Sequence, residues 1–241
     1  MKIAVKFFRN IWIIKYLPWS IYFNFHYFDL KTAIKLPVIL NRPKIKNLGG
    51  EIQLNGVVKF GMIKLGQYII STIPDTGIIL DIHGIIIFGG SATIGSGSAI
   101  CTGENGYLNI GNNFCSTATL RISCFHYIHI GDDNLISWDC TISDTDFHLL
   151  KSSKNQNICS QGYGNVHIGD NCWIGQGCHI LKNSSLASFT TVGAFTVITG
   201  KKISNEYSVI SNNLEIRVIK TDVHLDRNHE IKYPLHNEQQ S

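Results

Sequence analysis

The sequence predicts an all-β protein built as a parallel β-helix, a solenoid whose coils stack along one axis. The first observation is an aliphatic residue at every sixth position between 168 and 198, and the second is a small residue four positions after most of them. Neither the helical period of 3.6 nor the strand period of 2 produces a strict period of six. A repeat of this kind is typical of a hexapeptide β-helix, in which three repeats form one triangular coil. The aliphatic positions are Ile168, Ile174, Ile180, Leu186, Val192 and Ile198.

The same pattern occurs earlier in the chain, although less regularly. Aliphatic residues followed by glycine occur at Ile94, Ile110 and Ile130, and the six-residue spacing continues from Ile130 to Ile136 and Ile142. Glycine at such positions suits tight corners, because it adopts backbone angles that other residues avoid. None of these glycines forms a GxGxxG phosphate loop between a strand and a helix. We therefore expect the β-helix to cover residues 49–220.

The seven cysteines predict neither a disulfide framework nor a metal site, because their number is odd and no CxxC pair occurs. Cys140, Cys172 and Cys178 each follow an aliphatic repeat position by four residues, where other repeats have Ser184 or Thr196. We expect them to be small side chains that face the interior. Because the sequence shows no cleavable signal peptide, the expected compartment is the reducing cytoplasm.

Charge is distributed unevenly along the chain. The formal net charge is only +4, and residues 1–46 contain nine Lys or Arg against one Asp. A total this small does not indicate nucleic acid as a partner, and we expect none.

Residues 1–48 are predicted to form a basic, aromatic N-terminal segment followed by a linker. Arg9, Lys15, Pro18 and Asn24 interrupt the apolar run before the roughly 20 residues that a transmembrane helix needs. Residues 1–30 would suit a helix lying in a membrane interface, or a cap over the open end of the solenoid, and the two roles are compatible. Residues 31–48 are expected to be a linker, because prolines oppose helix continuation there.

The regular repeat is interrupted once over a long stretch. After the repeat at 130–142 comes the sequence SDTDFHLL, and then a polar loop at 149–165 without the six-residue period. A long loop that leaves a rigid scaffold and returns to it is a favoured place for a functional site. The polar tail at 221–241 is expected to cap the coil or to wrap a neighbouring subunit.

The candidate catalytic residue is His148, at the start of this loop. A neutral imidazole accepts a proton from a hydroxyl near neutral pH, and a carboxylate or carbonyl can fix its tautomer. Asp144 and Asp146 precede it in the sequence DTDFH, so either of them, or a backbone carbonyl, could orient the ring.

Three motifs in order resemble the hexapeptide-repeat sugar O-acyltransferases, closest to the capsular and lipopolysaccharide acetyltransferases and more distantly to the galactoside and maltose acetyltransferases. They are ISWDCTISDTDFH at 136–148, IGDNCWIG at 168–175 and VGAFTV at 192–197. The resemblance implies a left-handed β-helix, assembly as a homotrimer with active sites between subunits, and acetyl-CoA as the acyl donor without a metal.

The resemblance also implies roles for individual residues. His148 would be the general base, and the backbone N–H of Gln176 would stabilise the tetrahedral oxyanion. Further family positions for acetyl-CoA contacts fall on Trp173, Gly175, Gln176, Ala194, Thr199, Lys201, Lys202 and Lys220.

The expected function is transfer of acetyl from acetyl-CoA to a sugar hydroxyl of a cell-surface polysaccharide or its precursor, in the cytoplasm or at the inner face of the membrane. One alternative is a different acceptor, such as an amino sugar, serine or a xenobiotic alcohol. A second is a metalloenzyme of the γ-carbonic-anhydrase type, and a third is a scaffold without activity. The residues that contact sugar in galactoside acetyltransferases are not matched here around 117–125, so the resemblance does not identify the acceptor.

Overall fold

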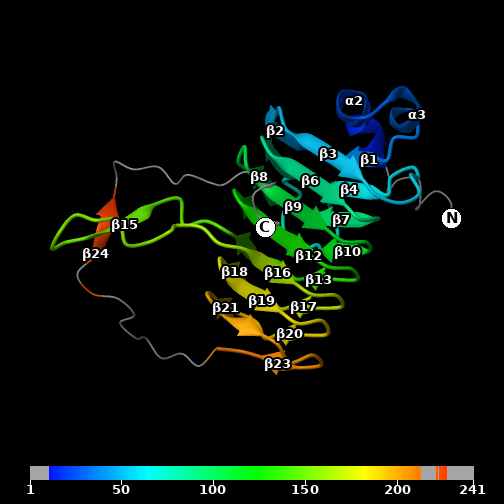
Figure 1. The fold of residues 1–241 in the computed structure, drawn as a ribbon. Helices are drawn as coiled ribbons and strands as arrows, with labels where there is room; N and C mark the ends of the chain where they lie inside the picture. The colour runs from blue at the N-terminus through cyan, green and yellow to red at the C-terminus, as the bar shows by residue number, and fades with distance from the viewer. Residues whose placement is uncertain (1–10, 213–220, 222, 227–241) are drawn as a thin grey trace.

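The computed structural model describes residues 11–212, 221 and 223–226, and it confirms the predicted parallel β-helix (Figure 1). Three parallel sheets form the three sides of the solenoid, and each coil contributes one strand to each sheet. In Figure 1 the near strands run to the right as the chain descends, so the coils wind as a left-handed helix. The fold thus departs from the right-handed rule for parallel crossovers.

The three sheets are named A, B and C in the order in which the chain enters them. Sheet A contains β1 (Val38–Leu40), β4 (Ile63–Gln67), β7 (Ala92–Gly95), β10 (Phe114–Ser116), β13 (Leu135–Ile136), β17 (Trp173–Ile174), β20 (Thr191–Val192) and β23 (Val209–Ile210). Sheet B contains β2 (Pro43–Leu48), β5 (Ile78–Ile82), β8 (Ser98–Thr102), β11 (Arg121–Cys124), β14 (Thr141–Ser143), β18 (His179–Leu181) and β21 (Val197–Ile198). Sheet C contains β3 (Glu51–Leu54), β6 (Ile85–Phe88), β9 (Tyr107–Ile110), β12 (Tyr127–Ile130), β16 (Val166–Ile168), β19 (Ser184–Leu186) and β22 (Lys202–Ile203).

The six-residue repeat fixes the register of these strands. Ile136 pairs with Ile174 and then Val192 in sheet A, and Ile142 pairs with Ile180 in sheet B. All six aliphatic positions between 168 and 198 are buried. Burying each such side chain contributes about 1.5–3 kcal/mol, so these ladders supply the core of the solenoid.

The cysteines at the small position of the repeat are also buried, as predicted. The thiol of Cys140 lies 3.1 Å from the carbonyl of Gly175 in the next coil, and the thiol of Cys178 lies 3.1 Å from the carbonyl of Gly193. Burial raises the pKa of both thiols, which keeps them protonated. Thr196 at the equivalent place donates to the carbonyl of Gly193 within its own coil, so the position favours a small side chain that can donate to a nearby carbonyl.

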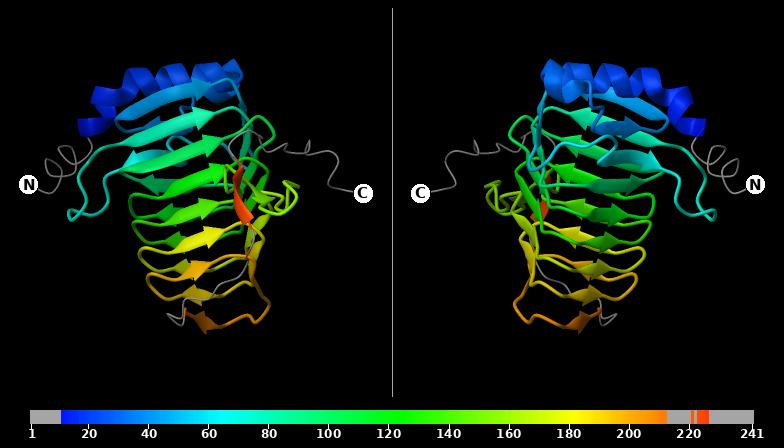
Figure 2. Two further views of the ribbon diagram at one scale, coloured as in Figure 1. Left: turned by 90° about the vertical axis from the view of Figure 1, so that its left-hand side faces the viewer. Right: turned by 90° about the vertical axis from the view of Figure 1, so that its right-hand side faces the viewer.

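The first coil begins earlier than the sequence suggested. β1 and β2 lie within 31–48, the stretch expected to be a linker, and they pair with β4 and β5. Pro43 is tolerated because it is the first residue of its strand. Helix α2 (Ile11–Tyr27) and the short helix α3 (Leu30–Ala33) lie across the open end of this coil (Figure 2), and Phe23 of α2 is buried in the core cluster. Residues 11–33 thus form a helical cap.

The interruption at 149–165 is a projecting arm that contains a strand. β15 (Leu149–Ser152) pairs antiparallel with β24 (Val223–Asp226), which belongs to the C-terminal tail (Figure 1). The predicted polar loop and the described part of the C-terminal tail therefore meet in a two-stranded ribbon outside the solenoid. The part of the tail expected at 227–241 lies outside the described residues.

Candidate active site

The predicted site residues fall on two different edges of the solenoid. We call the edge where the chain passes from sheet A to sheet B corner AB, and the edge where it passes from sheet B to sheet C corner BC. Gly175, Gln176 and Ala194 lie at corner AB, between β17 and β18 or between β20 and β21. The segment 144–148 and the arm leave the solenoid at corner BC, between β14 and β16.

Asp144 is buried at corner BC and is already occupied by backbone donors. Its carboxylate accepts the N–H groups of Phe125 and His126 from the preceding coil, both at 2.8 Å. Burial raises the pKa of this carboxyl group to about 6, although the two N–H groups oppose the shift. Asp144 therefore fastens two coils together, and the structure shows it bonded to the backbone rather than to His148.

Asp146 is committed to a different partner. Its carboxylate forms an ion pair at 2.8 Å with the ammonium group of Lys182, which lies on the next coil at the same corner. The backbone N–H of Asp146 donates to the carbonyl of Gly162 at 2.8 Å. These contacts fix the root of the arm to the solenoid and so position the residues that follow.

His148 lies exposed at that root. Phe147 before it has a left-handed backbone with φ of 59°, a conformation that is uncommon for a bulky residue. The ring of Phe147 meets the ring of Phe125 edge to face at 5.0 Å, which supports this turn. Within the described part of the chain, the His148 ring has no hydrogen-bond partner, so its nitrogens are available to a ligand.

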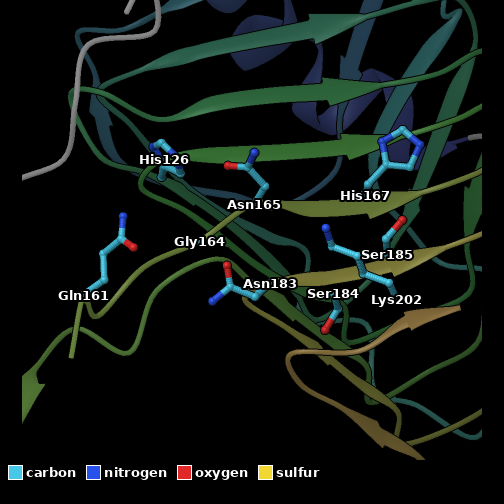
Figure 3. A pocket seen from close by; sticks show the side chains of 9 residues that line it. All are labelled: His126, Gln161, Gly164, Asn165, His167, Asn183, Ser184, Ser185 and Lys202. Carbon is cyan, nitrogen blue, oxygen red and sulfur yellow. The ribbon is translucent and has the colours of Figure 1, made fainter. Parts of the chain in front are cut away.

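A polar cavity of about 520 Å³ lies beside this segment, on the outer face of sheet C (Figure 3). In Figure 3 the returning end of the arm lies on one side of the cavity and sheet C on the other. The lining side chains are imidazoles, carboxamides, hydroxyls and one ammonium group, and no carboxylate is among them. The lining residues are His126, Gln161, Gly164, Asn165, His167, Asn183, Ser184, Ser185 and Lys202.

The cavity and the DTDFH segment are joined by hydrogen bonds. Gly164 in the cavity wall donates its N–H to the carbonyl of Asp144 at 2.9 Å, and His126 donates its N–H to the Asp144 carboxylate. Asn183 follows Lys182, the ion-pair partner of Asp146. The cavity therefore adjoins the root of the arm, although His148 itself does not line it.

Sequence reasoning missed most of this cavity. His129, His167, Ser185 and Lys202 are paired in register on successive strands of sheet C, and the rings of His129 and His167 stack at 4.6 Å. Burial and the neighbouring His167 lower the pKa of His129. The sequence did contain a signal for these residues. Each strand of sheet C from β12 onward has a polar residue next to an aliphatic residue that packs in or against the core, and these polar residues recur once per coil.

Corner AB carries a stack of unused backbone donors. The N–H groups of Trp138, Gln176 and Ala194, which occupy equivalent places on three successive coils, find no acceptor among the described residues. Such donors can bind a developing oxyanion or the amide carbonyls of an extended ligand. Gln176 is thus placed with a free N–H, as its predicted role requires.

The other residues predicted near corner AB are placed as follows. A Cβ atom at Gly175 would lie 2.7 Å from the carbonyl oxygen of Val192, so packing between coils already requires glycine there. Ala194 is exposed. Trp173 is 53% exposed and pairs with Leu135 and Thr191 on the outer face of sheet A. It is the first residue of β17, which leads into corner AB.

Three of the remaining predicted contacts for acetyl-CoA lie at corner BC. Thr199 and Lys201 are exposed in the turn between β21 and β22, and Lys202 lines the cavity. Lys220 lies outside the described residues. The structure therefore divides the predicted contacts between two corners. They lie at opposite ends of the strands of sheet B, on the order of 15 Å apart.

Potential metal ligands do not gather in the described part of the chain. No group of three or more His, Cys, Asp or Glu side chains lies close enough there to hold a metal ion. In the same residues, no helix is both long and apolar enough to cross a membrane.

The family "Bacterial transferase hexapeptide (six repeats)" matches residues 165–200 of the chain. These residues form strands β16 to β21, where the repeat is regular and every coil is in register. The matched segment is therefore a run of hexapeptide repeats, and the chain has the left-handed parallel β-helix that such repeats specify.

Two solved structures show similarity to the chain. One is the polySia specific acetyltransferase NeuO, with 13% identity, coverage of 81% of this chain and 90% of that chain, and a TM-score of 0.48. The other is a point mutant of AntD, an N-acyltransferase from Bacillus cereus, in complex with dTDP and coenzyme A; it has 17% identity, coverage of 76% and 82%, and a TM-score of 0.34. A comparison with curated proteins gives no match.

Proposed function

We propose that this protein is an acyl-CoA-dependent O-acetyltransferase that transfers acetyl from acetyl-CoA to a sugar hydroxyl of a cell-surface polysaccharide or its precursor. The observation that carries the proposal is the exposed His148 at the root of the arm, beside a polar cavity of about 520 Å³. Cavities lined by amides, hydroxyls and imidazoles suit ligands that are rich in hydroxyl groups. The names of the similar structures, an acetyltransferase and an N-acyltransferase, are consistent with this activity.

In the proposed reaction, His148 accepts the proton of the acceptor hydroxyl while the hydroxyl oxygen attacks the thioester carbonyl of acetyl-CoA. The negative charge of the tetrahedral intermediate develops on the former carbonyl oxygen, where the backbone N–H of Gln176 would stabilise it. The carbon–sulfur bond then breaks, and the thiolate takes the proton from the imidazolium of His148. The products are the acetyl ester and coenzyme A.

The proposed site is completed by a neighbouring subunit of a homotrimer. His148 and the Gln176 N–H lie on opposite edges of sheet B within one chain, too far apart to act on one carbonyl. A cyclic trimer can bring corner BC of one subunit against corner AB of the next. An acetyl-CoA molecule held between them would contact Ala194 on one side and Lys201 on the other.

An assay with labelled acetyl-CoA and a panel of sugar acceptors tests this proposal. The His148→Ala variant should lose about 10²–10⁴-fold in turnover, because a general base contributes that much. The matched control is His83→Ala, which removes an exposed histidine from a different coil. Turnover by His148→Ala equal to that of the control would refute the mechanism, and transfer to amines alone would refute the O-acyl acceptor.

A further inference from the structure

The cap helix α2 turns an apolar stripe toward the solvent. Ile14, Ile21, Tyr22 and Phe25 are 59%, 42%, 53% and 48% exposed. Their spacing of seven, eight and eleven residues from the first places them on one face of a helix. The exposed Leu30 and Ile34 follow along the chain, in and just after α3.

The opposite face of α2 holds the helix in this orientation by polar contacts. The buried side chain of Asn24 accepts the N–H of Val38 at 3.1 Å and donates to the Val38 carbonyl at 2.7 Å. The hydroxyl of Ser20 accepts the N–H of Leu40 at 3.0 Å. Together with the buried Phe23, these bonds to β1 fix the orientation of α2, so its second apolar face is left toward the solvent.

The charges around the stripe are almost all positive. Between residues 14 and 36, Lys15, Lys31 and Lys35 are exposed, and Asp29 is the one carboxylate. Tyr22 and the neighbouring Trp19 add aromatic rings with polar tips, the side chains that gather at membrane–water interfaces. A second copy of the chain would bring like charges together on this face, whereas anionic lipid headgroups would complement them.

We propose that the cap face, defined by Ile14, Ile21, Tyr22, Phe25, Leu30 and Ile34, docks the protein on a membrane that contains anionic lipids. None of the described helices has the length and apolarity to cross a bilayer, so α2 lies in the interface with its stripe among the headgroups. This inference stands on the N-terminal cap and is independent of the acyl-transfer proposal.

The docked orientation follows from the fold. Figure 2 shows α2 lying across the end of the solenoid, roughly perpendicular to the axis along which the coils stack. In a cyclic trimer whose symmetry axis runs along the coils, three cap faces would meet the membrane together, which strengthens binding without new contacts. Strand β17 lies five coil steps, roughly 24 Å, beyond β1. Helix α2 adds about 10 Å between β1 and the membrane, so the proposed site would lie roughly 30–35 Å from the membrane surface. An acceptor carried on a lipid would need to extend over that distance.

Flotation of the full-length protein with vesicles tests the proposal. Vesicles of phosphatidylcholine with about 30% phosphatidylglycerol should carry the wild-type protein, and phosphatidylcholine alone should bind at least several-fold less. Ile21→Asp/Phe25→Asp should lower binding at least tenfold. The matched control, Tyr207→Asp/Val209→Asp, changes two exposed apolar residues near the far end of the solenoid and should bind like wild type.

Circular dichroism and size-exclusion chromatography of both double variants establish that they are folded. The proposal is overturned if the wild-type protein does not float, if the cap variant floats like the control, or if the cap face drives end-to-end self-association instead. Equal binding to neutral and anionic vesicles would overturn the assignment of anionic lipid. Acetyl transfer to a soluble acceptor should be the same for the cap variant and wild type, so a failure here is distinct from a failure of the enzymatic proposal.

Discussion

Corner AB and corner BC differ in what they offer chemically. Corner AB repeats the same turn on successive coils and presents backbone N–H groups at Trp138, Gln176 and Ala194. Corner BC is interrupted by the arm and presents side chains, among them His148 and the lining of the cavity. Regular repetition thus supplies identical backbone donors, whereas the proposed general base, His148, lies where the repetition is broken. Neither corner holds a complete set of groups for acyl transfer.

After the loss of His148 itself, blocking corner AB should have the largest effect on turnover. The Ala194→Trp substitution places a bulky ring beside the Gln176 N–H, and we expect turnover to fall by two to three orders of magnitude, since one oxyanion donor alone contributes about 10²–10³. Because Ala194 is exposed, thermal unfolding should remain unchanged. The control is Glu206→Trp, which places the same ring at an exposed position in the turn between β22 and β23. Full activity of Ala194→Trp would remove corner AB from the site.

At corner BC, the buried Asp144 should make stability depend on pH. Its pKa is about 6 in the folded protein and 3.8 in the unfolded chain, so the folded state binds more protons between these values. Stability should therefore fall as pH rises from about 4 to 6, by up to about 3 kcal/mol from this group.

The measurement for Asp144 is the free energy of unfolding in urea at several pH values, compared between wild type and Asp144→Asn. The variant lacks the titrating group. The free energy of unfolding of the wild type, relative to that of the variant, should therefore fall as pH rises from about 4 to 6. Parallel curves for the two proteins would contradict the assignment of a raised pKa to Asp144.

Breaking the ion pair at the root of the arm should have a smaller effect on turnover. Lys182→Met frees Asp146, and we expect a loss of about tenfold because His148 is then less well positioned. Stability should change by less than about 1 kcal/mol, as for other partly exposed pairs. Arg42→Met breaks a comparable pair with Asp75 and should leave turnover unchanged. Equal turnover in both variants would show that the pair does not position His148.

The smallest effect is expected inside corner AB. Cys178→Thr keeps a small side chain that can donate to the Gly193 carbonyl, as Thr196 already does. We expect a change of less than about 1.5 kcal/mol in the free energy of unfolding and no change in turnover. A large loss of activity would instead indicate chemistry at the thiol.

The sequence predicted the solenoid because its core is one ladder of inward side chains repeated every six residues. It did not predict β1 and β2, because the prolines in 31–48 indicate a linker, whereas Pro43 is tolerated as the first residue of β2. The pairing of β15 with β24 joins segments about 70 residues apart, and local patterns carry no information about such a contact.

For the site, the sequence predicted the position of His148 at a break in the repeat but not the roles of its acidic neighbours. Asp144 and Asp146 are two residues apart in DTDFH, yet one is buried against backbone N–H groups and the other pairs with a lysine. Which acid turns inward depends on the coil beneath it. The cavity was missed because its residues come from separate coils and the returning arm.

The proposed active site combines corner BC of one subunit with corner AB of its neighbour. Co-expression of His148→Ala and Ala194→Trp chains with different tags, followed by purification of mixed trimers, tests it most directly. In every mixed cyclic trimer, one of the three interfaces pairs an intact His148 with an intact corner AB, so about a third of wild-type turnover should return. Separately purified trimers of each variant should remain inactive. Mixed trimers that are equally inactive would contradict a site shared between subunits.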